Sequence, residues 1–252
     1  MNRILAAFMF FTRLPFWRIK QVPAECFKHV VNYWSFAGWL TGGIMAGVYG
    51  LASYAFPAEA AAILALAARL LVTGALHEDG LADFFDGFGG GTDRSRILAI
   101  MKDSHIGSYG VIGLICYFLL LTCLIAALPP HLAVCALLSF DAWNKFVAAN
   151  LVNLLPYARK EEESKAHTVY DRMKPKEFLL AALAGICWML ILMPPLFWPA
   201  TLCPLVLFFL LVALMKRKLG GYSGDCCGAT FLLCELSSYA GIYLIYALTE
   251  QL

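Results

Sequence analysis

Charged residues are scarce in this chain of 252 residues. Asp, Glu, Lys and Arg make up 14% of it, whereas 61% of the residues are hydrophobic. Soluble domains carry about 25% charged residues, so the composition predicts a polytopic membrane protein with little material for a separate soluble domain. The net charge of +2 is too small to indicate a nucleic-acid partner.

The sequence also lacks paired cysteine motifs. Its nine cysteines are scattered without a CxxC pair, and the adjacent Cys226 and Cys227 would close only a strained ring. This excludes a disulfide framework and a zinc site, so we expect the cysteines to act as small apolar residues in lipid or a reducing compartment. The first apolar run is interrupted by Arg13 and has no small-residue cleavage site, so we expect no signal peptide. No internal repeat is evident.

Long apolar runs make up most of the sequence. Seven of them come close to the ~20 residues that cross about 30 Å of hydrocarbon, and proline-rich turns separate two pairs. Basic residues gather in alternate connections, which predicts a cytoplasmic N-terminus and an external C-terminus. We therefore expect an all-α helical bundle with about seven transmembrane helices, forming one integral domain over residues 1–252 in the cytoplasmic (inner) membrane. The runs are residues 36–56, 58–77, 107–128, 131–155, 177–194, 196–214 and 225–249.

Residues 1–34 combine an aromatic face with basic residues and precede the first run. This pattern predicts an amphipathic segment lying on the membrane surface. The alternative is an ordinary juxtamembrane anchor. The basic residues are Arg3, Arg13, Arg18, Lys20 and Lys28.

An acidic stripe follows the apolar helix expected at residues 63–76. Asp79, Asp83 and Asp86 are spaced i, i+4, i+7, so they fall within an arc of roughly 60° on one helix face. Three carboxylates on one stripe repel one another unless a cation lies among them, and oxygen ligands favour Mg²⁺. The alternative is a solvated acidic helix end.

The stripe runs into a glycine-rich stretch, and residues 78–106 are expected to form a cytoplasmic catalytic loop. Asp93 is an expected N-cap of a short helix. Glycines allow a ligand close to the backbone, and helix N-termini bind anions. Together with the acidic stripe they predict a Mg²⁺–phosphate site, whereas the basic residues alone would only mark the cytoplasmic side. These basic residues are Arg94, Arg96, Lys102 and His105.

A second cluster begins the last apolar run. Gly220, Gly224 and Gly228 repeat every four residues, which favours close helix packing. Asp225 is expected level with the acidic stripe, either as a further oxygen ligand or as an N-cap. Arg159, just beyond a span, is a candidate phosphate contact.

Four charged residues lie in the interior of the spans, away from their ends, where charge is costly and often functional. Asp141 and Lys145 have the i, i+4 spacing of a neutralising pair, although a substrate contact stays open. Arg69 is expected to pair with Glu235 or Asp141. Glu235 has two alternatives, a functional carboxylate or a protonated one bonded to a neighbouring helix.

With these residues identified, the chain resembles the cobalamin synthase family, the adenosylcobinamide-GDP ribazoletransferases. The matching motifs occur in the family's order and span nearly the whole chain. They are FFTRLPF at 10–16, GALHEDGLADFFDGFGGG at 74–91, ILAIMKDSHIGSYGVIGL at 97–114, PYARKE at 156–161 and LGGYSGDCCGATFLLCELS at 219–237.

The resemblance implies a Mg²⁺-dependent membrane phosphotransferase. It would join adenosylcobinamide-GDP to α-ribazole or its 5′-phosphate and release GMP. By position, the acidic stripe matches the family's acidic motif, Asp103, Ser104 and Gly107 match its second motif, and Gly224 and Asp225 match its third. His105 stands where arginine is expected, which weakens a permanent positive charge. The implied metal ligands are Asp79, Asp83, Asp86 and Asp225, the implied catalytic carboxylates are Asp83, Asp86 (as proton acceptor) and Asp103, and the implied substrate contacts are Arg94, Arg96, Lys102, Ser104, His105, Arg159 and Gly224.

The sequence leaves two other functions open. A CDP-alcohol phosphotransferase also uses a membrane aspartate stripe to displace a nucleoside monophosphate. A transporter would use the four charged residues within the spans as a midplane pathway. The expected partners are the small-molecule substrates and the lipid bilayer, and the oligomeric state stays open, with a homo-oligomer among the alternatives.

Overall fold

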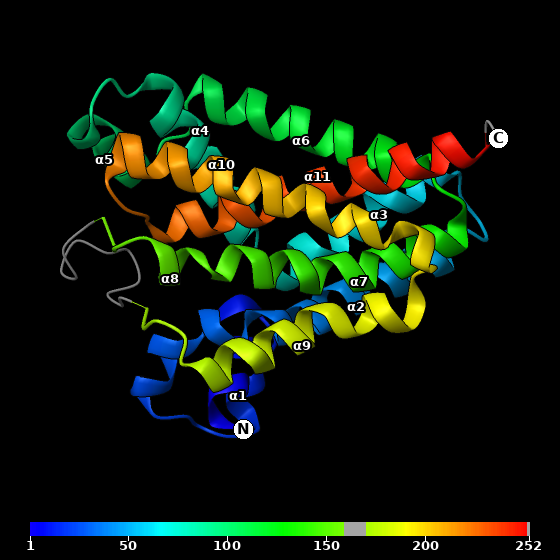
Figure 1. Ribbon diagram of the computed structural model, residues 1–252, viewed down its shortest axis with the longest axis horizontal. Helices are drawn as coiled ribbons and strands as arrows, with labels where there is room; N and C mark the ends of the chain where they lie inside the picture. Colours follow the sequence, from blue (N-terminus) through cyan, green and yellow to red (C-terminus); the bar gives the residue numbers. More distant parts are fainter. Residues whose placement is uncertain (159–169, 251–252) are drawn as a thin grey trace.

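The protein is a bundle of long helices that lie side by side along its longest axis (Figure 1). The computed structural model describes residues 1–158 and 170–250. Within these ranges the pairing of β type is a single isolated bridge between Tyr157 and Tyr222, so the predicted all-α fold is confirmed. The helices are α1 (Asn2–Phe11), α2 (Trp34–Ala52), α3 (Ala58–Thr73), α4 (Leu76–Gly90), α5 (Arg94–Lys102), α6 (Ser108–Ala126), α7 (Pro130–Ala149), α8 (Leu151–Leu154), α9 (Pro175–Leu192), α10 (Leu202–Leu219) and α11 (Gly224–Glu250), with 3₁₀ segments η1 (Phe16–Arg18), η2 (Ala24–His29), η3 (Val31–Tyr33) and η5 (Pro195–Thr201).

Several of these helices are long and apolar enough to cross a membrane. By length and composition five described helices qualify, or six if the bent pair α3–α4 counts as one span. Polar and charged groups are few on their outer faces, where Ile112, Leu119 and Phe209 are among the exposed side chains. This supports a polytopic membrane bundle. The count of seven spans and the orientation stay predictions.

The expected single helix through residues 58–77 is wrong, because the chain turns by 95° between α3 and α4. Gly74 and Ala75 both adopt the left-handed conformation, with φ of 67° and 57°, and their N–H groups donate to the carbonyl of Leu70. Such a cap ends a helix. A Cβ on Gly74 would lie 2.0 Å from Nε of Arg13, so this glycine also makes room for the N-terminal segment. We call the bend at Gly74 and Ala75 the elbow.

Within residues 78–106 the two expected helical stretches are present, but the glycine run that was expected to be a loop is helical as well. Helix α4 continues through the glycines to Gly90, and α5 follows after a short turn. A Cβ on Gly87 would lie 2.5 Å from Cγ of Met101, and one on Gly89 would lie 2.7 Å from Cγ of Tyr109. The glycines therefore let α5 and the start of α6 pack directly on α4, which keeps the glycine run helical despite its poor intrinsic propensity.

A buried ionic network holds the bundle beneath the elbow. The Arg69 guanidinium on α3 is fully buried and lies 2.6 Å from Glu235 of α11 and 3.4 Å from Glu78 of α4. It also donates to the Tyr117 hydroxyl at 2.8 Å, and this hydroxyl donates to Glu235 at 2.6 Å. Arg69 thus joins α3, α4, α6 and α11.

A second buried pair adjoins the first. Lys145 forms an ion pair with Asp141 on α7 and donates to the Thr41 hydroxyl of α2 at 2.8 Å. Its ammonium nitrogen also lies 4.3 Å from the centre of the Phe231 ring. Asp141 is 3.9 Å from Arg69. The neutralising pair is confirmed, and so is the pairing of Arg69, with both expected carboxylates.

Replacing Arg69 tests this network. Arg69→Ala leaves Glu78 and Glu235 buried without their cation, so we expect a loss of about 3–5 kcal/mol in the free energy of unfolding. Thermal unfolding of the purified protein in detergent measures it. Arg217→Ala, an exposed arginine of α10, is the matched control and should stay within about 0.5 kcal/mol. Equal stability of the two variants would contradict the network's role.

Candidate active site

Helices α4 and α11 are in backbone contact where two of the sequence motifs meet. A Cβ on Gly80 would lie 3.0 Å from the carbonyl oxygen of Asp225, and one on Gly228 would lie 3.1 Å from the carbonyl oxygen of His77. Asp79 directly precedes Gly80 in α4. The contact therefore places Asp225, at the start of α11, alongside the acidic stripe, as the resemblance implied.

The three glycines of the repeat at the start of α11 were expected to allow close helix packing, but they have different environments. Only Gly228 makes the close approach to another helix. Gly220 ends α10 with a φ of 65°, and Gly224 is exposed with open space where a Cβ would lie. The packing interpretation is therefore wrong for two of the three glycines, while the open space at Gly224 suits its expected contact with a substrate.

The three aspartates of the stripe differ in burial and in partners. Asp79 is exposed, Asp83 is half-buried and Asp86 is buried. The two carboxylate oxygens of Asp86 accept hydrogen bonds from the backbone N–H groups of Gly107 and Gly110, at 2.7 and 2.8 Å. Asp86 therefore caps the N-terminus of α6, where a negative charge is stabilised by the helix dipole.

The glycines of the second motif make this cap possible. A Cβ on Gly107 would lie 2.4 Å from one oxygen of Asp86, and a Cβ on Gly110 would lie 2.5 Å from the other. Through these bonds Asp86 positions the start of α6 directly after the loop that carries Asp103 and Ser104. Two of its roughly four acceptor sites are used in this way, and its expected role as proton acceptor stays a prediction.

The loop between α5 and α6 presents polar groups at the surface. Asp103 accepts hydrogen bonds from the backbone N–H of His105 at 3.0 Å and from its ring Nδ1 at 2.7 Å. These bonds, the ring contact above all, lower the pKa of Asp103. The side chains of Asp103, Ser104 and His105 are exposed, so they are accessible to a substrate.

Helix α5 carries the basic residues of the site. Asp93 caps it as expected, accepting from the backbone N–H of Arg96 at 3.0 Å, and the Ser95 hydroxyl and this N–H lower its pKa. Arg94 donates to the carbonyl of Ala158 at 2.9 Å, so its guanidinium is partly used in holding the chain after α8. Arg96 and Lys102 are exposed.

The chain after α8 pairs with the segment that precedes α11. Ala158 donates to the carbonyl of Tyr222 at 2.8 Å, and Tyr222 donates to the carbonyl of Pro156 at 3.0 Å. This pairing ties the PYARKE motif to the approach of α11, at the end of the bundle where α5 also lies (Figure 1). Arg159 itself lies outside the described residues.

The carboxylates suit a magnesium ion better than a preassembled metal centre. In the described ranges, no three His, Cys, Asp or Glu side chains are close enough to hold a metal by themselves. Mg²⁺ usually takes one or two protein carboxylates and completes its shell with water and substrate phosphate oxygens. One or two carboxylates among Asp79, Asp83 and Asp225 would supply the protein ligands that such an ion needs.

Sequence reasoning missed Gly80 and Gly110, and it matched Gly107 to the family's second motif without its contact with Asp86, although the geometry depends on all three. Each makes a contact with a residue that is remote in sequence, so spacing alone gives no sign of it. Their presence inside the motifs beside aspartates was the available signal, because a glycine within a helix or at its start requires a packing reason.

Comparison with known proteins agrees with the motifs. The family model described as cobalamin-5-phosphate synthase matches residues 3–243. Curated proteins named adenosylcobinamide-GDP ribazoletransferase are similar to the chain. That of Shewanella woodyi is 38% identical over 91% of this chain and 91% of its own length, and that of Shewanella sp. strain W3-18-1 is 34% identical over 96% and 93%. No solved structure matches the chain.

The cap made by Asp86 generates a prediction. Asp86→Ala leaves two N–H groups at the start of α6 without an acceptor, so we expect a loss of about 1–3 kcal/mol in the free energy of unfolding. Gly110→Ala should cause a similar loss, because its Cβ would collide with the carboxylate of Asp86. Gly90→Ala is the matched control, because its Cβ would meet only Ile100 at 3.6 Å. Thermal unfolding compares all three, and an Asp86→Ala protein as stable as the parent would contradict the cap.

Proposed function

The chain belongs to the cobalamin-5-phosphate synthase family of enzymes, and from this premise we propose that it is a Mg²⁺-dependent phosphotransferase. The proposed reaction joins adenosylcobinamide-GDP to α-ribazole or its 5′-phosphate. It releases GMP and gives adenosylcobalamin or its 5′-phosphate. The single observation that carries the proposal is the contact of Gly80 with the backbone of Asp225, which brings the start of α11 against α4 next to Asp79, beside the open space at Gly224.

The proposed reaction replaces the pyrophosphate (anhydride) bond of the substrate with a phosphodiester bond. The ribazole hydroxyl attacks the phosphorus attached to cobinamide, so a new P–O bond forms while the bond to the GMP oxygen breaks. Bound Mg²⁺ would neutralise the pyrophosphate and the departing GMP. We assign its ligands to Asp79 and Asp225, and we assign the hydroxyl proton to Asp83, the half-buried carboxylate that follows Asp79 along the stripe.

The basic side of the site would bind the nucleotide. Arg96 and Lys102 of α5 are exposed and bring positive charge to the same end of the bundle. We propose that they contact the phosphates of the substrate, with Arg94 and Arg159 beside them. Ser104 and Gly224 would approach the substrate through a hydroxyl and an unobstructed backbone. We place this site on the cytoplasmic face of the inner membrane, following the positive-inside distribution of charge.

Two substitutions separate the assigned roles. Asp79→Asn removes a proposed ligand, so we expect the Mg²⁺ concentration for half-maximal activity to rise about 10–100-fold, with activity partly recovered at high Mg²⁺. Asp83→Asn removes the proposed base, so kcat should fall about 10²–10⁴-fold at any Mg²⁺ concentration. Membranes or purified protein given adenosylcobinamide-GDP, α-ribazole and Mg²⁺ provide the assay, with GMP and the cobalamin product measured by chromatography.

The control for both is Glu59→Gln, an exposed carboxylate at the start of α3, which should leave activity unchanged. Full activity of Asp83→Asn would contradict its assignment. Release of CMP from a CDP-alcohol, with no turnover of the corrinoid substrate, would instead identify a CDP-alcohol phosphotransferase. Electrogenic uptake into proteoliposomes without GMP release would identify a transporter.

The contact between Asp103 and His105 predicts a pH dependence. Because the ring bond lowers the pKa of Asp103, this carboxylate stays ionised to a lower pH than an ordinary aspartate. His105→Ala removes the bond and raises the pKa, so activity that needs ionised Asp103 should be lost at a higher pH as the pH falls. The acidic limb of kcat/KM against pH measures this, and identical limbs in the two proteins would contradict the role of Asp103.

A further inference from the structure

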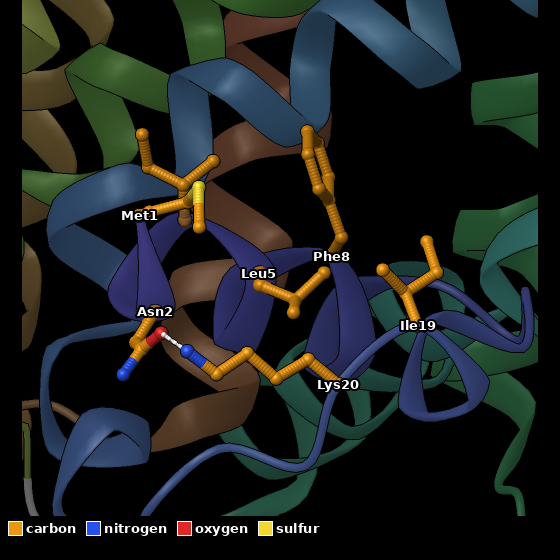
Figure 2. Close-up of a pocket in the computed structure, with 7 residues that line it drawn as sticks. Met1, Asn2, Leu5, Phe8, Ile19 and Lys20 are labelled. Carbon is orange, nitrogen blue, oxygen red and sulfur yellow. Dashed lines mark hydrogen bonds between the residues drawn. The ribbon is translucent and has the colours of Figure 1, made fainter.

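A pocket on the outer side of α1 lies apart from the acidic stripe. Its volume is about 280 Å³, roughly the liquid volume of nine water molecules. Met1, Leu5, Phe8 and Ile19 supply apolar walls, and Figure 2 shows their side chains grouped along α1. At one edge the Lys20 ammonium donates to the Asn2 side-chain oxygen at 3.1 Å.

The position of α1 brings this pocket to the side of the bundle. Ten residues rise about 15 Å, which is too short to cross some 30 Å of hydrocarbon. Ala6, Ala7 and Phe11 are buried against the rest of the protein, so the helix is held along the bundle by one face. The opposite face carries the pocket, where Ile19 is 72% exposed and Met1 94% exposed.

Basic side chains lie at one edge of the pocket. Lys20 lines it, Arg18 is two residues earlier in the chain, and both are exposed. The neighbouring Arg3 is already paired with Glu177. A groove with apolar walls and a cationic edge, on a helix too short to span, complements a molecule with a long apolar tail and an anionic head.

We propose that this pocket binds an acyl chain of an anionic phospholipid from the surrounding bilayer. The chain would lie against Leu5, Phe8 and Ile19, and the phosphate would accept hydrogen bonds from Lys20 and Arg18. Lys20 has donors left for this after its bond to Asn2, because an ammonium group carries three. This site is independent of the proposed reaction, since no residue of the pocket belongs to the acidic stripe or to α5.

The test uses the full-length protein in nanodiscs and a phosphatidylglycerol probe with a photoactivatable group in its acyl chain. After irradiation, peptide mapping locates the label. We expect enrichment in residues 1–20 over the exposed face of α6. Unlabelled phosphatidylglycerol should displace this label at least fivefold more effectively than phosphatidylcholine.

Variants connect the label to the pocket. Leu5→Trp fills the pocket and should reduce labelling of residues 1–20 at least fivefold. Ile112→Trp, a matched change on the exposed face of α6, should leave it unchanged. Lys20→Gln should abolish the preference for the anionic competitor, whereas Lys218→Gln at the end of α10 should not. Lys20 is exposed, so its variant keeps the test valid if Leu5→Trp fails to fold.

Three outcomes would overturn the proposal. One is labelling spread evenly over the exposed faces of α6, α9 and α10. Another is equal competition by phosphatidylcholine. The third is crosslinking of residues 1–20 to a second copy of the chain, which would identify that copy as the occupant. Each result is independent of GMP release, so it leaves the proposed function to its own assay.

Discussion

One buried cation, Arg69, fixes the position of the helix that carries the acidic stripe. It lies at the end of α3 and contacts carboxylates of α4 and α11 as well as the Tyr117 hydroxyl of α6. In a low-dielectric interior an arginine must be satisfied by several acceptors, and its planar fork can bind more than one at once. The direction in which α4 leaves the elbow is therefore set by the same interaction that closes the bundle around it.

The elbow changes the direction of the chain from the apolar helix α3 to the acidic helix α4 within two residues, so the acidic stripe lies on a helix and not on a loop. Beyond Gly74 and Ala75 the chain is still helical, so the carboxylates of α4 project from a rigid element that is packed on both sides. Glycines occur where neighbours approach: Gly80 against α11, Gly87 against α5, and Gly110 of α6 against Asp86. A site on helices can be held more accurately than one on loops, and metal-assisted phosphoryl transfer depends on positioning.

Much of this arrangement could be predicted from the sequence, because it is periodic. The apolar runs, the i, i+4 pair of Asp141 and Lys145, and the cap of α5 by Asp93 all follow from local spacing. The elbow could not be predicted, since the apolar run continues through it and Ala75 is not a residue that favours a left-handed conformation. The helical glycine run was equally hidden, because side chains from α5 and α6 stabilise it. Tertiary packing there overrides local propensity.

The acidic stripe shows why identical residues on one helix face need not share one role. Helix α4 passes between α11 and the N-terminus of α6. At its start, the backbone of Asp225 reaches Gly80 beside Asp79, so this part of the stripe lies next to the start of α11. Two turns later, the N–H groups of Gly107 and Gly110 surround Asp86 and use its charge to complete α6. What each aspartate can do is therefore decided by which neighbouring helix it meets, and a cation can be shared only where the neighbour contributes oxygen rather than N–H. Asp86, which sequence spacing made equivalent to the other two aspartates, thus holds the start of α6 after the loop of Asp103 and Ser104. The proposed chemistry is assigned to the exposed end of the stripe.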